Sequence, residues 1–146
     1  MILTLTRPIA CWQKEYETGH AFIDEQHQSL FEIVNTLHEA VINREEVDTL
    51  QRLMDGFARH TVDHFQQEEA LMLMVHYPDY ARHKQTHDLL LSKMNSLLQK
   101  LRAQHVEMTV DITQFISEWL THHIKGEDRK MTQFLQQIQE LPISCN

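Results

Sequence analysis

A chain of 146 residues is long enough to bury a substantial core, and with only three Gly and three Pro its composition favours helices over turns and loops. The formal net charge of −8 at pH 7 argues against nucleic acid as a partner, because nucleic acids select basic faces. No window approaches about 18 continuous apolar residues, so we expect no membrane span. The unusual feature is the eleven His, since histidine is the commonest metal ligand in proteins.

The two cysteines, Cys11 and Cys145, stand near opposite ends of the chain. Neither has a CxxC partner or a His at ligand spacing, so we expect inert thiols in a reducing cytoplasm. A disulfide between them is the alternative, because an up-down bundle brings its termini to the same end. The apolar run at the N-terminus is short and is interrupted by Arg7 and Pro8, unlike a signal peptide. We therefore expect a soluble cytoplasmic protein with one domain over residues 1–146.

Residues 1–20 lack helical periodicity and are predicted to form an extended arm, which Trp12 and Tyr16 pack onto the rest of the molecule. The first helix is expected over about 22–43, where apolar residues recur at steps of three and four. His27 falls on this apolar face. It is therefore either a metal ligand or a core histidine satisfied by a hydrogen bond.

The second helix is expected over about 47–75. It carries His64 and Glu68 four residues apart on its apolar stripe, and therefore on one face. A carboxylate on a buried face is costly unless it is paired or bound to a metal, so Glu68 argues against a purely structural pattern. The neighbouring Glu69 falls off the stripe and is predicted to be a solvated charge.

A break at Pro78 ends the second helix, because proline cannot continue it and the preceding residue avoids the helical region. The third helix is expected over about 79–102, with Asp79 as its N-cap. His83 and His87 repeat the four-residue spacing. Apolar residues continue on their face, which favours a buried pair over the alternative of two exposed side chains.

The fourth helix is expected over about 110–141. It contains His123 and Asp128, whose five-residue separation corresponds to about 500° of rotation in a regular helix and leaves them about 140° out of line. Gly126 lies between them. We therefore predict a local irregularity there, a π-type widening or a break, that turns Asp128 inward.

Four amphipathic helices with short links predict an all-α, up-down-up-down four-helix bundle over about 22–141, with an extended N-terminal arm. The apolar stripes are expected to face its core, and Phe115 and Ile138 of the fourth helix are included in them. Six His match no ligand spacing and are assigned to the surface or to places behind the ligands: His20, His38, His60, His76, His105 and His122.

The candidate ligands are five imidazoles and two carboxylates without a thiolate, a set that suits iron or another borderline first-row metal. Ferritin-like di-iron sites need two Glu-x-x-His motifs, whereas this chain has one, at residues 17–20 of the arm, which disfavours ferritin-type chemistry. The candidates are His27, His64, Glu68, His83, His87, His123 and Asp128.

Four segments around these residues resemble the bacterial hemerythrins, which are four-helix di-iron oxygen-binding proteins. They are 19–31 (GHAFIDEQHQSLF), 64–69 (HFQQEE), 77–87 (YPDYARHKQTH) and 119–128 (WLTHHIKGED). The resemblance runs from Trp12 to about Met131, and every ligand position of the family holds the expected residue type.

The resemblance implies a centre of two Fe ions with an oxo or hydroxo bridge. It assigns His83, His87 and His123 to one iron and His27 and His64 to the other. It assigns Glu68 and Asp128 as carboxylate bridges between the two irons. Counting coordination positions leaves one open, on the iron with two His, where the family binds O2 reversibly. Four nearby side chains are candidates for an apolar wall of the O2 pocket, with ordinary core packing as the alternative for each: Phe65, Trp119, Leu120 and Ile124.

The predicted function is reversible O2 binding, as an oxygen carrier, store or local supply, and not catalysis. O2 is the expected ligand; no protein partner is indicated, and we expect a monomer or weak oligomer. The alternatives are an O2 or redox sensor of a signalling system, and nitric oxide handling, peroxide handling or iron donation for repair. Hemerythrin-like domains occur fused to signalling modules, and the sensor alternative includes the case that these 146 residues are an excised domain.

Overall fold

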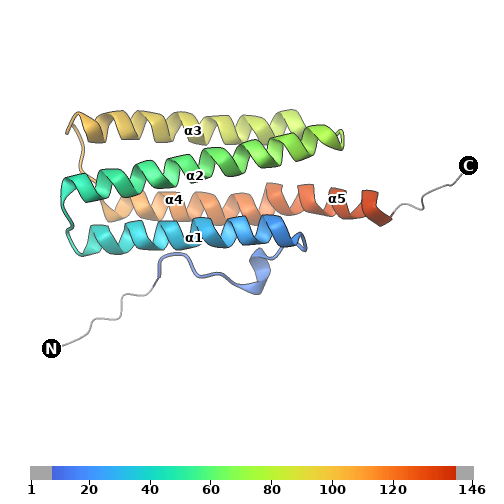
Figure 1. Ribbon diagram of the computed structural model, residues 1–146, viewed down its shortest axis with the longest axis horizontal. Coiled ribbons are helices and arrows are strands. Elements are labelled where there is room, and N and C mark those ends of the chain that lie inside the picture. Colours follow the sequence, from blue (N-terminus) through green and yellow to red (C-terminus); the bar gives the residue numbers. More distant parts are fainter. Residues whose placement is uncertain (1–7, 141–146) are drawn as a thin grey trace, which may run out of the picture.

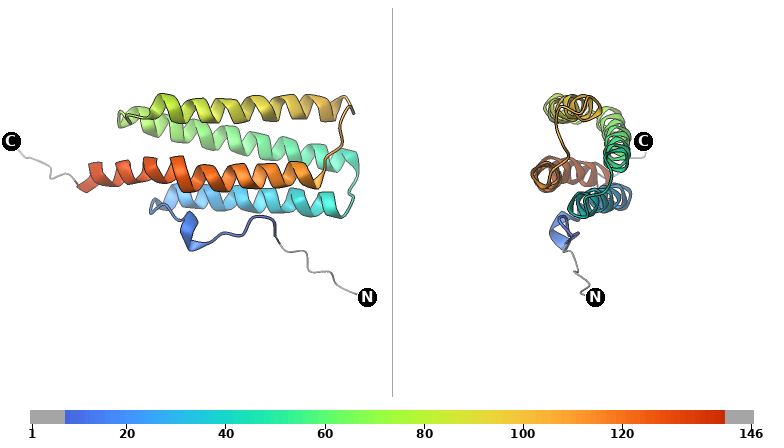
Figure 2. Two further views of the ribbon diagram at one scale, coloured as in Figure 1. Left: turned by 180° about the vertical axis from the view of Figure 1, so that it is seen from behind. Right: turned by 90° about the vertical axis from the view of Figure 1, so that its left-hand side faces the viewer.

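Four helical columns run alternately up and down in the computed structural model, which describes residues 8–140 (Figure 1). The end-on view in Figure 2 shows the columns surrounding a common centre. The predicted four-helix bundle is confirmed. The elements in chain order are η1 (Lys14–Tyr16), α1 (Ala21–Ile42), α2 (Val47–Met74), α3 (Tyr80–Arg102), α4 (Val110–His123), the π-helical segment η2 (Ile124–Asp128) and α5 (Arg129–Glu140).

Three of these helices end in the same way, which explains the sharp reversals between the columns. Arg44, His76 and Gln104 follow the ends of α1, α2 and α3 in the left-handed conformation, with φ of 54°, 53° and 58°. In each case the amide of this residue and the next amide bond back to carbonyls of the last helical turn, as in a Schellman motif. The capped carbonyls allow each helix to stop without leaving unpaired backbone groups.

The start of α3 has the predicted residue at its N-cap. Asp79 occupies the N-cap position, but its side chain does not bond to the backbone of the helix. Its carboxylate lies 2.8 Å from Nζ of Lys130 in α5, and this contact lowers the pKa of Asp79. The predicted N-cap position is therefore confirmed, but an ion pair across the bundle takes the carboxylate away from the amides.

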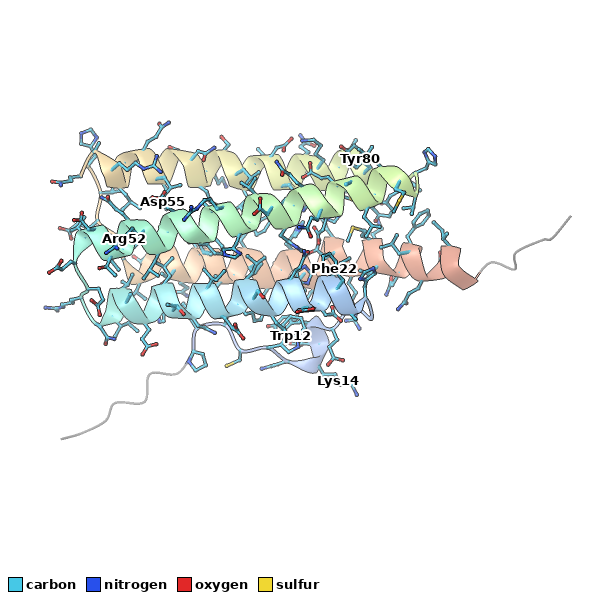
Figure 3. The ribbon with its side chains drawn as sticks, viewed as in Figure 1. Trp12, Lys14, Phe22, Arg52, Asp55 and Tyr80 are labelled. Carbon is cyan, nitrogen blue, oxygen red and sulfur yellow. The ribbon has the colours of Figure 1, made fainter. Side chains whose placement is uncertain are left out.

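The arm before α1 lies along the outside of the bundle, with Trp12 between the arm and α1 (Figure 3). The rings of Trp12 and Tyr16 pack edge-on against Phe31, with centroid distances of 5.2 and 5.1 Å. The side chain of Asn35 accepts a bond from the Ala10 amide (2.8 Å) and donates one to its carbonyl (2.7 Å). The predicted packing of the two arm aromatics is confirmed.

Gly19 joins the arm to α1 with a φ of +87°, a left-handed value that favours glycine. A Cβ at this position would also meet the end of the Gln136 side chain of α5, which would have to move aside. Other predictions concern residues 1–7, Leu141 and Cys145, which lie outside the described part of the chain. Cys11, the other cysteine, is exposed.

The columns bury apolar faces against one another, and Val34, Leu37 and Met54 are completely inaccessible. Phe115 and Ile138 were expected inside, but they are 44% and 37% exposed. Ile138 lies near the end of α5, which projects past the other columns, so no neighbour covers it (Figure 1). Phe115 lies on the outer face of α4, with the Lys93 ammonium 5.7 Å from its ring centroid. No helix within residues 8–140 combines the length and apolar character needed to cross a bilayer.

Candidate metal centre

The seven candidate ligands converge in the middle of the bundle, although they come from five elements. Each is buried, with exposed fractions between 0% and 6%. Their donor atoms form two groups, each within 4.8 Å, which share the two carboxylates. The first group contains Glu68, His83, His87, His123 and Asp128, and the second contains His27, His64, Glu68 and Asp128.

The local sequence explains how Asp128 reaches this cluster. Residues Ile124–Asp128 form a π-helical segment within the fourth column. A π turn closes its hydrogen bond over five residues instead of four, so residues five apart fall in line. Asp128 consequently lies on the same side as His123 and is only 1% exposed. The predicted widening near Gly126 is confirmed.

The first group places one oxygen of each carboxylate among three imidazoles. Oε1 of Glu68 lies 3.2 Å from Nε2 of His87 and 3.7 Å from Nε2 of His83. Oδ1 of Asp128 lies 2.9 Å from Nε2 of His83 and 3.0 Å from Nε2 of His123. Five donor atoms thus surround one point.

The second group uses the other oxygen of each carboxylate. Oε2 of Glu68 lies 3.0 Å from Nε2 of His64 and 3.5 Å from Nε2 of His27. Oδ2 of Asp128 lies 3.0 Å from Nε2 of His27. Each carboxylate therefore directs one oxygen to each group of imidazoles, which is the arrangement of a bridge between two metal ions.

Most of these donor atoms lack the hydrogen-bond partners that buried polar atoms ordinarily have. Leaving a buried polar atom unpaired costs about 1–3 kcal/mol, and more when the group is charged. A bound cation would satisfy all of them at once. The unpartnered donor atoms are Nε2 of His27, His64 and His83 and both carboxylate oxygens of Glu68 and Asp128.

A second test of fit comes from His87 and His123, whose Nε2 atoms lie only 3.0 Å apart. Nδ1 of His87 faces the Glu69 carboxylate at 3.0 Å, so this nitrogen carries the proton and Nε2 presents a lone pair. Two ligand atoms at right angles around one ion, each about 2.1 Å away, are about 3.0 Å apart. The residues present therefore fit a pair of metal ions.

The electrostatics of the metal-free cluster favour positive charge within it. Burial lowers the pKa of His27 and His83, but the negative charge of the adjacent Asp128 and Glu68 carboxylates outweighs burial and raises these pKa values to about 9 and about 10. Burial likewise raises the pKa of Glu68 and Asp128, yet the surrounding imidazoles hold both well below their ordinary values. The carboxylates are thus anionic and attract either protons or metal cations.

Three polar side chains behind the ligands were not identified from the sequence. Glu69 was predicted to be a solvated charge, but its side chain is only 15% exposed and bonds to His87, so that prediction is wrong. Oε1 of Gln26 lies 2.6 Å from Nδ1 of His64. Oε2 of Glu127 lies 3.7 Å from Nδ1 of His123, a contact that the four-residue spacing of the pair could have suggested.

The four predicted wall residues all lie near the imidazoles or in the adjoining core. Phe65 stacks on His87 with a centroid distance of 3.7 Å and an interplanar angle of 4°. Trp119 stacks on His123 at 4.6 Å and 17°. Leu120 and Ile124 are 4% and 1% exposed and belong to the same apolar cluster as Phe65.

One of the remaining His is not where it was predicted. His38 is buried, and its Nδ1 donates to the hydroxyl of Thr113 at 2.7 Å, because that hydroxyl is itself donated to the Val110 carbonyl. His20 accepts a bond from the Ile23 amide at the start of α1. The other four are exposed, as predicted: His60, His76, His105 and His122.

Comparison with known proteins agrees with this geometry. Residues 18–135 match the family described as the hemerythrin HHE cation binding domain. The chain belongs to the hemerythrin family. Hemerythrins bind O2 at a di-iron centre, and the buried cluster of this member is suited to holding metal.

Individual hemerythrins resemble the chain over most of its length. The bacteriohemerythrin of Methylococcus capsulatus is 36% identical over 117 residues, covering 79% of this chain and 87% of its own. A hemerythrin-like protein of Naegleria gruberi is 33% identical over 130 residues, covering 89% and 96%. A crystal structure of wild-type hemerythrin superimposes with a TM-score of 0.81 at 31% identity, covering 84% of this chain and 95% of the other. The crystal structure of a leucine-to-alanine hemerythrin variant superimposes with a TM-score of 0.84 at 30% identity, covering 87% of this chain and 97% of the other.

Proposed function

We propose that this hemerythrin binds O2 reversibly at a di-iron centre and serves as an oxygen carrier, store or local supply, without catalytic turnover. The observation that carries the proposal is the division of the carboxylate oxygens between two groups of imidazoles. The proposed ligands are His83, His87 and His123 on one side, His27 and His64 on the other, and Glu68 and Asp128 between them.

When bound, two ferrous ions supply the electrons that O2 takes up on binding and returns on release. The protein makes the two sides of this centre unequal. One group offers three imidazoles and two carboxylate oxygens, whereas the other offers two imidazoles and two oxygens. The group that contains His27 and His64 therefore offers fewer protein donors to its metal ion. We assign the binding of O2 to this group.

The second contribution of the protein is to keep the centre dry. Phe65, Leu120 and Ile124 are buried beside the ligands, and Trp119 covers one face of His123. Apolar side chains at these positions exclude water and proton donors. A low-dielectric surrounding also strengthens the attraction between the anionic carboxylates and a bound cation.

The test is the visible absorption spectrum of the reduced, iron-loaded protein while O2 is admitted and then removed by argon. We expect a band that appears with O2 and disappears under argon over several cycles. A His123→Gln variant should lose this band, whereas His122→Gln, which changes the exposed neighbour, should keep it. Irreversible conversion to a stable diferric spectrum at the first exposure would contradict reversible binding.

A further inference from the structure

The seven proposed ligands are at most 6% exposed, so a metal ion that loads the finished bundle must pass through its wall. Two surface cavities each reach one of these ligands. One has a volume of about 230 Å³ and ends at His64. The other has a volume of about 270 Å³ and ends at His83.

The charges lining the two cavities distinguish them as entrances for a cation. The cavity at His83 is lined by the cationic side chains of Arg82 and Lys130 and by the carboxylates of Asp79 and Glu127. Its carboxylate from Asp79 is already paired with Lys130 at 2.8 Å. The two positive and two negative charges cancel there, so this cavity attracts a divalent cation less than a cavity with an unbalanced carboxylate would.

The cavity at His64 is lined by no cationic side chain and by several potential metal donors. Its lining residues are Gln26, Ser29, Leu30, His60, Asp63, His64 and Gln67. Four of them lie on α2 as two pairs three residues apart, His60 with Asp63 and His64 with Gln67, and the two pairs are four residues apart, so all four share one side of the helix. His60 and Asp63 are exposed, whereas His64 is buried at the inner end, with its Nε2 unpartnered among the donor atoms of the centre.

Two glutamines, the half-buried Gln26 and the exposed Gln67, lie across this path outside His64. Nδ1 of His64 donates to Oε1 of Gln26 at 2.6 Å, and the amide nitrogen of Gln26 donates to Oε1 of Gln67. The chain of bonds joins α1 to α2 directly over His64. Rotation of these two side chains would open the path without moving a helix.

We propose that this cavity is the port through which divalent metal ions, Fe²⁺ first among them, enter the centre. His60 and Asp63 provide the first, transient ligands at the surface. Gln26 and Gln67 form the gate, and His64 is the first permanent ligand that the ion meets. The proposal rests on the ligand set proposed above, but it concerns loading and does not depend on O2 binding.

The experiment mixes metal-free protein with Co²⁺ without O2 and follows uptake by the visible absorption of the bound ion, with the final metal content measured separately. An anionic side chain at the mouth of a cavity speeds the arrival of a cation, and salt weakens the effect. We expect Asp63→Asn to slow uptake about three- to tenfold at low salt, with a smaller difference at high salt. His60→Gln should also slow uptake, and both variants should reach the same final metal content as the unmodified protein.

Asp79→Asn is the matched control, because it makes the same substitution in the cavity at His83. It should leave the uptake rate unchanged. Equal rates of Co²⁺ uptake for Asp63→Asn and the unmodified protein would overturn the proposal that metal enters through the cavity at His64. Slowing by Asp79→Asn instead would place the entrance at His83, and absence of any metal uptake by the unmodified protein would overturn the proposed centre together with the port.

Discussion

The imidazole of His87 is held from both sides, by the Glu69 carboxylate at Nδ1 and by the ring of Phe65 stacked on its face. Such a partner keeps the proton on one nitrogen and leaves the other free for a metal. His64 has the same arrangement with a neutral acceptor, the amide of Gln26. The residues behind His87 and His64 therefore determine which nitrogen of these two rings faces the centre.

We predict that Glu69→Gln weakens metal binding, because a neutral amide replaces the carboxylate that orients the His87 ring. Loss of such a partner typically lowers metal affinity about 10- to 100-fold. Competition with a chelator of known affinity measures the change. Glu39→Gln, which neutralises an exposed side chain of α1, serves as the control, and equal affinities for the two variants would show that Glu69 plays no such part.

A second prediction concerns Leu120, which is 4% exposed in the apolar cluster beside the ligands. Leu120→Ser would bring a hydroxyl and water into this region, and we expect faster autoxidation of the O2-bound protein. The measurement is the loss of its visible band in air. Leu89→Ser, at a position that is 59% exposed, should leave the rate unaltered. An unchanged rate in Leu120→Ser would remove this residue from the wall.

Among the elements, the fourth column shows how a local change of helical geometry places a side chain. The π segment η2 lies between α4 and α5 and adds the residue that brings Asp128 round to the side of His123. The ends of the other columns use three left-handed residues, none of which is glycine. A side chain in this conformation costs about 1 kcal/mol, so these ends are less stable than they could be.

We therefore predict that Gln104→Gly, after α3, stabilises the protein by about 0.5–1 kcal/mol, because glycine adopts the left-handed conformation without strain. Urea unfolding of the metal-free protein measures the free energy of unfolding. Gln99→Gly, which places the same residue within α3, should instead destabilise by about 1 kcal/mol. A loss of stability in both variants would mean that the left-handed position carries no strain.

The whole bundle buries two carboxylates and five imidazoles at its centre. Without metal, many of their donor atoms have no hydrogen-bond partner. Loading with metal should therefore stabilise the fold strongly. A ligand at about 1,000 times its Kd contributes about 4 kcal/mol, which corresponds to an increase in Tm of about 10 °C for a domain of this size.

Calorimetry of loaded and chelator-treated protein tests this expectation. Replacement of a shared carboxylate, in Asp128→Asn, should reduce the difference in Tm between the two forms. His122→Gln should preserve it, since that side chain is exposed. Identical Tm values for the loaded and metal-free protein would contradict a role for the centre in stability.

The sequence by itself determined the features that depend on neighbours within one helix. The helical stripes, the pairs His64–Glu68 and His83–His87, and the widening at Gly126 all follow from residues at most five apart. The helix bounds and the π segment could be predicted for this reason. The resemblance carried by the same residues added the family, which the comparisons then established.

Only the tertiary structure decided which groups meet across the bundle. Gln26 and His64 are 38 residues apart, Glu69 and His87 are 18 apart, and His38 and Thr113 are 75 apart. No local pattern brings such residues together, because their contacts depend on the rotation and register of packed helices. For the same reason, the division of the carboxylate oxygens between two groups of imidazoles became visible only once the four columns were assembled.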